Sequence, residues 1–138
     1  KGIVHRIDYE KRELIVKTNN DFENISFDTA IMCTGYKPLL PPIDNIDQFI
    51  NNGVYTLCSI SDLQQIKMKL WQNARAIVIG AGAIGLEVAY ALKEKGLLVT
   101  VIEAKDVLPN AIDSDMAELI KEYCKNNNIN IILHSTVQ

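Results

Sequence analysis

Residues 75–103 read RAIVIGAGAIGLEVAYALKEKGLLVTVIE, and this stretch decides the fold of the chain. An apolar run, a glycine-rich turn, a helical stretch and a second apolar run follow one another, and the last residue is Glu103. This order is typical of a βαβ unit that binds a dinucleotide. We therefore expect strands over residues 75–80 and 97–103, joined by a helix over residues 83–95.

The glycines of the turn have the G-x-G-x-x-G spacing of a phosphate-binding loop. Gly80 can take the tight turn out of the strand, Gly82 lets the backbone approach a pyrophosphate, and Gly85 lets the helix pack against the sheet. The backbone N–H groups of Ala83 and Ile84 lie at the positive end of the helix, so they are predicted to face the phosphates.

Glu103 lies eighteen residues after Gly85, close to the spacing of an acid that accepts hydrogen bonds from the adenosine ribose. Its charge would repel the 2′-phosphate of NADP, so we expect NAD(H) to be preferred over NADP(H). Lys105 is the nearby residue that could soften this repulsion. A βαβ crossover that binds nothing is the structural alternative to this interpretation.

Composition limits the other classes of function. The chain has 138 residues and a net charge of −3 without a basic block, so we expect no nucleic-acid partner. Its apolar runs are interrupted well before the roughly 20 residues of a membrane span. Cys33, Cys58 and Cys124 form no metal-ligand pairing and no disulfide framework, which predicts a metal-free cytoplasmic protein with buried cysteines.

The N-terminal part shows a different pattern. Alternating apolar and polar residues over 3–27, with breaks at 10–12 and 19–21, predict two or three antiparallel strands. The apolar run over 30–33 predicts a strand that is buried on both faces. Three prolines at positions 38–42 force an extended path, and we expect the linker there.

Between the linker and the βαβ unit, the sequence predicts a short strand over 53–57. Ser61 and Asp62 are expected to cap a helix over 62–71.

A second amphipathic helix is expected over 114–126, capped by Asp113 or Ser114, and a further parallel strand over 129–133. Helical spacing predicts one buried stripe on that helix, formed by Met116, Leu119, Ile120 and Tyr123.

The order of these motifs resembles the FAD-dependent pyridine nucleotide–disulfide oxidoreductases, in particular their NADH oxidase, coenzyme A-disulfide reductase and nitrite reductase branch. The resemblance rests on a β-meander, the run Thr34-Gly35-Tyr36-Lys37-Pro38, the glycine loop over 80–85, and Leu108-Pro109. It implies an α/β fold. Residues 43–138 would form a Rossmann-like NAD(H)-binding domain with a parallel sheet, truncated at its C-terminus. Residues 1–42 would be the antiparallel meander and Thr-Gly-x-x-Pro segment of an incomplete FAD-binding domain.

The same resemblance implies roles for single residues. Thr34 and Gly35 would lie at the flavin, although Cys33 stands where the family usually has alanine. Ala83 stands where the family commonly has a tyrosine that covers the flavin. Glu87 matches a glutamate near the nicotinamide and the flavin.

For the whole protein, the resemblance implies hydride transfer from NADH to FAD and then to a disulfide, dioxygen or another acceptor. We interpret the chain as an excised piece without catalytic residues of its own, so it is expected to be inactive. Its uncovered N-terminal strands predict self-association, and the parent is expected to be a homo-oligomer. A non-catalytic nucleotide-sensing Rossmann domain and a flavin-independent NAD-dependent dehydrogenase remain as alternatives.

Overall fold

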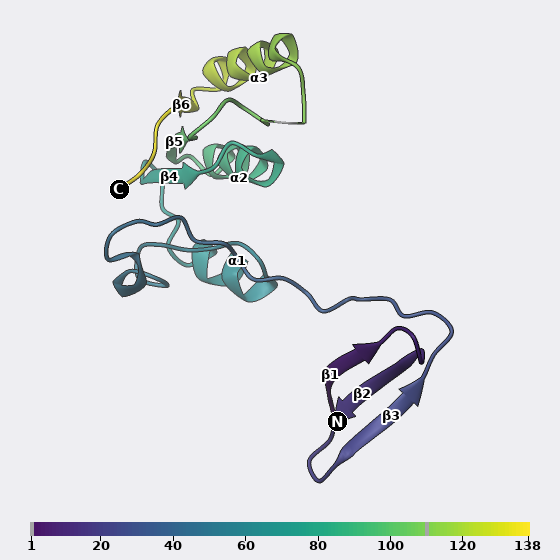
Figure 1. The fold of residues 1–138 in the computed structure, drawn as a ribbon. Coiled ribbons are helices and arrows are strands. Elements are labelled where there is room, and N and C mark those ends of the chain that lie inside the picture. Colours follow the sequence, from purple (N-terminus) through teal and green to yellow (C-terminus); the bar gives the residue numbers. More distant parts are fainter. Residues whose placement is uncertain (1, 110) are drawn as a thin grey trace. The chain divides into compact units, whose positions relative to one another are not determined.

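The computed structural model describes residues 2–109 and 111–138 (Figure 1). It divides into two units, Lys1–Tyr36 and Lys37–Gln138, which are described separately. The first unit contains an antiparallel sheet, and the second contains helices and a parallel sheet, so the expected α/β class is confirmed. Within the described residues, no helix has both the length and the apolar character needed to cross a bilayer.

The first unit is a three-stranded meander, as the alternating pattern predicted. Its strands are β1 (Ile3–Asp8), β2 (Glu13–Lys17) and β3 (Phe22–Ser26), and β2 pairs with both neighbours. Turns separate the strands at the two polar breaks of the sequence. Alternating patterns are reliable here because each strand exchanges hydrogen bonds with the strand that directly follows it.

The predicted strand over 30–33 is wrong. This segment is an exposed loop, with Ile31 83% and Met32 69% exposed. An apolar run becomes a strand only when a neighbour pairs with its backbone, and no described strand pairs with this one. Cys33 is likewise exposed, contrary to expectation, whereas Cys58 is half-buried and Cys124 is buried.

The predicted strand over 53–57 is also wrong. The second unit begins with a 3-10 helix, η1 (Ile46–Gln48), and the region after it forms only an isolated bridge between Ile50 and Val54. The region around 53–57 is therefore loop that leads into the next helix.

Helix α1 (Ile60–Lys67) starts earlier than predicted, because Ser59 rather than Ser61 is its N-cap, and it also ends earlier, at Lys67. The Oγ of Ser59 accepts the N–H of Asp62 at 3.2 Å, and the Asp62 carboxylate accepts the N–H of Ser59 at 2.8 Å. The same carboxylate accepts the Cys58 N–H at 2.8 Å, and these backbone bonds lower the pKa of Asp62. This reciprocal capping box fixes the first turn of the helix.

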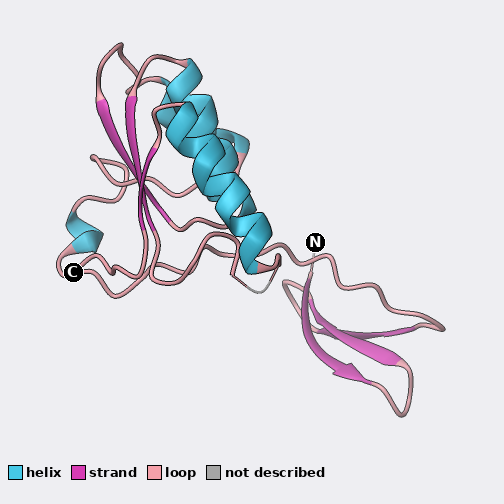
Figure 2. Cartoon of the chain, turned by 90° about the horizontal axis from the view of Figure 1, so that it is seen from above, coloured by secondary structure: helices cyan, strands magenta, loops and turns pink. Residues whose placement is uncertain are grey.

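The βαβ pattern is confirmed almost to the residue. The parallel sheet has the order β4 (Arg75–Ile79), β5 (Leu98–Ile102), β6 (Asn130–Ile132). Helix α2 (Ala83–Glu94) joins β4 to β5, and α3 (Ser114–Asn126) leads into β6. Figure 2 shows the helices, which overlap in that view, on one side of the strands, and Figure 1 shows α3 next to α2.

The core lies between these helices and the sheet. On β5, Val99 and Val101 face the helices and are buried, while Leu98 on the opposite face is exposed. Ala89 of α2 is fully buried, which lets the helix pack closely on the sheet. The buried apolar residues are Ala74, Ala81, Ala89, Leu97, Val99, Val101, Val107, Ala117, Cys124 and Ile129.

The stripe predicted on α3 is wrong for three of its four members. Met116, Leu119 and Tyr123 are at least half-exposed, and only Ile120 packs against the core. The helix instead buries Ala117 and Cys124, and burial raises the pKa of the Cys124 thiol. Both sets of residues satisfy helical spacing, and the small side chains allow the closer approach to the sheet. Helix α3 begins after Asp113 as predicted, although the Asp113 side chain makes no capping hydrogen bond.

Candidate functional site

The turn between β4 and α2 is fixed to the end of the neighbouring strand. The backbone N–H of Gly80 donates to the carbonyl of Ile102 at 2.8 Å, directly after the last pairing of β4 with β5. Gly80 has a φ of 106°, in the left-handed region that side chains disfavour. A glycine at this position therefore lets the chain leave the strand sharply and enter the turn.

The other two glycines of the motif have different surroundings. A Cβ on Gly85 would overlap with the carbonyl oxygen of Gly80, so glycine is required for the helix to lie this close to the turn. A Cβ on Gly82 would meet no atom within 4 Å. The backbone at Gly82 thus faces open space, as a loop that receives a pyrophosphate requires.

The N-terminus of α2 opens at the same turn. Gly82 is its N-cap and brings no side chain, and the first turn contains no acidic residue. The first helical bond runs from the N–H of Leu86 to the carbonyl of Gly82 at 3.0 Å, which leaves the N–H groups of Ala83, Ile84 and Gly85 ahead of it. These donors and the helix dipole favour an anion at this position.

Glu103 lies directly after β5 and reaches the glycine turn with its side chain. Its Oε2 accepts the backbone N–H of Ala81 at 2.8 Å, and its Oε1 accepts the N–H of Lys105 at 2.9 Å. The backbone N–H of Glu103 donates to the carbonyl of Ile132 at 2.9 Å, which extends the pairing toward β6. The structure thus brings the predicted acid to the predicted loop, where its carboxylate is held by two backbone donors.

The segment over residues 105–108 is hydrogen-bonded to the glycine turn. The N–H of Leu108 donates to the carbonyl of Ala81 at 3.0 Å, and the neighbouring Val107 is buried. Asp106 accepts the Val107 N–H at 2.6 Å, and its carboxylate lies 2.9 Å from the Nζ of Lys121 on α3. The hydrogen bond from Lys121 lowers the pKa of Asp106, and Glu118 and Asp106 raise the pKa of Lys121.

The remaining predicted residues belong to other segments of the chain. Thr34 and Gly35 belong to the first unit, in an exposed segment where Gly35 has a φ of 75°. Glu87 is exposed on the second turn of α2. Sequence reasoning used Leu108 only as part of a family motif and assigned no role in the turn to Ala81 or Leu108, because both act there through backbone groups.

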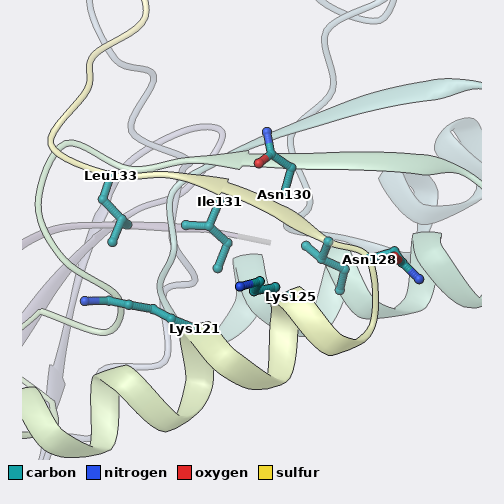
Figure 3. Close-up of a pocket in the computed structure, with 7 residues that line it drawn as sticks. Lys121, Lys125, Asn128, Asn130, Ile131 and Leu133 are labelled. Atoms are coloured by element: carbon teal, nitrogen blue, oxygen red, sulfur yellow. The ribbon is translucent and has the colours of Figure 1, made fainter.

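A groove of about 580 Å³ lies apart from the glycine turn, between α3 and β6 (Figure 3). Two lysines of α3 contribute to it, but Lys121 is already paired with Asp106 and Glu118. In the part of the chain that the structure describes, no group of His, Cys, Asp and Glu side chains could hold a metal ion. The groove is lined by Lys121, Lys125, Asn128, Ile129, Asn130, Ile131 and Leu133.

Comparison with known proteins identifies relatives over nearly the whole chain. An NADH oxidase of Methanocaldococcus jannaschii is 37% identical over 131 residues, which cover 93% of this chain and 28% of that protein. The chain thus spans less than a third of the length of this curated relative.

Solved structures show the same fold. A water-forming NADH oxidase from Lactobacillus brevis bound to NADH has a TM-score of 0.72 and 29% identity, covering 98% of this chain and 30% of that chain. An NAD-dependent persulfide reductase from A. fulgidus has a TM-score of 0.74 and 31% identity, covering 98% of this chain and 25% of that chain. The pattern of the family described as pyridine nucleotide-disulphide oxidoreductase matches residues 1–138, so the resemblance inferred from the motifs is confirmed and the chain belongs to this family.

Proposed function

We propose that this chain is the NAD(H)-binding part of a longer flavin-dependent oxidoreductase. The observation that carries the proposal is the open backbone at Gly82, in front of the free N–H groups of α2. A relative with 29% identity is an NADH oxidase whose solved structure is bound to NADH, which supports the same ligand here. The whole protein would pass hydride from NADH to FAD, and electrons then to a disulfide, dioxygen or another acceptor.

The residues of this chain would bind and orient the dinucleotide. Gly82 and the N–H groups of Ala83 and Ile84 would receive the pyrophosphate, and Glu103 would accept hydrogen bonds from the adenosine ribose. The bound nicotinamide supplies the hydride chemistry, and the protein supplies position and electrostatics. Glu87 is one turn into α2 and is proposed to lie near the nicotinamide.

We further propose that residues 1–42 belong to the FAD-binding domain and residues 43–138 to the NAD(H)-binding domain. Thr34 and Gly35 would then contribute to the flavin site. These residues are too few to hold FAD without the remainder of a flavin domain, so the isolated chain is expected to be colourless and inactive in NADH oxidation.

Two measurements test the proposal. Calorimetric titration of the protein with NADH should give saturable binding with a stoichiometry of one, and absence of binding would overturn the NAD(H) assignment. The full-length protein should carry a yellow flavin that NADH bleaches under anaerobic conditions. NADH binding by a full-length protein without flavin would favour a nucleotide sensor or a flavin-independent dehydrogenase instead.

A further inference from the structure

Both backbone polar groups of Ala81 are held by the segment that follows β5. Its N–H donates to the Glu103 carboxylate at 2.8 Å, and its carbonyl accepts the N–H of Leu108 at 3.0 Å. Ala81 is fully buried, so water does not replace these partners. The residues on both sides, Gly80 and Gly82, are the most flexible type in the chain. The orientation of the two peptide groups that flank the Ala81 Cα therefore depends on these two partners: Glu103 holds the Gly80–Ala81 peptide, and Leu108 holds the Ala81–Gly82 peptide.

Glu103 is well suited to hold the Gly80–Ala81 peptide group. An ionised carboxylate makes a stronger hydrogen bond to a backbone N–H than a neutral acceptor does. The N–H of Lys105 binds the other oxygen at 2.9 Å and fixes the plane of the carboxylate. Two carboxylate oxygens offer about four acceptor positions, so these two bonds leave room for ribose hydroxyl groups.

We propose that Glu103 is a positioning residue for the phosphate-binding turn, which it orients through the Ala81 N–H, in addition to binding the ribose. This inference rests on the proposed NAD(H) site. A residue that contacts only the ribose affects only ligands that have the ribose hydroxyl groups. A residue that orients the turn affects every ligand whose pyrophosphate binds there.

The test compares NAD⁺ with its analogue whose adenosine ribose lacks both hydroxyl groups, the 2′,3′-dideoxy form. Binding of both ligands to wild type, Glu103→Ala and Glu103→Gln is measured by calorimetry. Glu103→Ala should weaken binding of the dideoxy analogue by roughly three- to tenfold, the value of one hydrogen bond. Glu103→Gln keeps an acceptor for Ala81, so it should restore part of that loss. Glu122→Gln, a change of an exposed glutamate on α3, is the matched control for the loss of charge.

Hydrogen exchange of the Ala81 amide provides a second measurement that does not need a ligand. Exchange should be faster in Glu103→Ala than in wild type, with Glu103→Gln between them. If wild type and Glu103→Ala bind the dideoxy analogue equally well, the positioning role is overturned. Binding of NAD⁺ by wild type would still support the proposed function in that case. Unchanged exchange at Ala81 would overturn the role as well. If wild type binds neither ligand, the proposed function itself fails.

Discussion

A side chain on Gly85 and the carbonyl oxygen of Gly80 would occupy the same space. The Gly80 N–H is hydrogen-bonded to Ile102 of β5, so moving the Gly80 backbone aside would cost free energy. Gly85→Ala is expected to lower the free energy of unfolding by about 1–3 kcal/mol, the usual cost of overpacking. Urea unfolding followed by circular dichroism measures the change, and a loss below about 0.5 kcal/mol would contradict the packing argument.

Gly82→Ala is the matched control, with a different expected result. Gly82 has an extended backbone that alanine can adopt, and its Cβ would point into open space. The variant should therefore unfold like wild type but bind NADH more weakly, because the methyl group would occupy the approach of the pyrophosphate. Wild-type affinity for NADH in this variant would place the dinucleotide away from Gly82.

Cofactor preference should follow the charge of Glu103. The carboxylate faces the turn, and the 2′-phosphate of NADP would bring a like charge against it, at a cost of about 1–3 kcal/mol. We expect NADH to bind roughly ten- to a hundredfold more tightly than NADPH in competitive titrations. Lys105→Gln should widen this difference, because it removes the nearby positive charge. Equal affinities in wild type would contradict the role of Glu103.

The capping box of α1 gives a prediction with an internal control. Ser59→Ala removes the acceptor for the Asp62 N–H and should lower the free energy of unfolding by about 1 kcal/mol. Ser61→Ala replaces a serine within the first turn by a better helix former and should change stability by less than about 0.5 kcal/mol. Thermal unfolding of both variants and of wild type measures these two changes in stability. A larger loss in Ser61→Ala than in Ser59→Ala would move the cap to the position that the sequence predicted.

The Asp106–Lys121 pair predicts a dependence of stability on pH. Because Lys121 lowers the pKa of Asp106 in the folded protein, the pair stabilises the fold above the unfolded pKa of about 3.9. This contribution is lost as the pH falls through the lower folded pKa. Asp106→Asn should thus be less stable than wild type near neutral pH, and the difference should shrink on acidification. Chemical unfolding at several pH values measures it, and a difference independent of pH would rule out the charge as its cause.

Local sequence patterns predicted the parts of the structure whose partners are near in sequence. The meander pairs each strand with the next one, and the βαβ unit has its glycines, helix and strands within residues 75–103. The motif spacing also predicted that Gly80, Gly82, Gly85 and Glu103 meet at one turn, and the structure brings them together there. Such a motif is informative because glycine is needed where the backbone has a positive φ or lies close to another group.

Where the sequence offered several equally suitable strands, helix faces or helix caps, only the tertiary structure decided which of them forms. The apolar run at 30–33 has the composition of a strand but lacks a described partner, and α3 has two faces with helical spacing. Ser59 and Ser61 are both suitable caps, and the reciprocal contact with Asp62 selects Ser59. The hydrogen bond from the Ala81 N–H to the Glu103 carboxylate joins residues that are 22 positions apart in the sequence. The sequence by itself determined the βαβ unit and its glycine turn, because their requirements are local. The tertiary structure decided burial and the support of that turn, because both depend on contacts between distant segments.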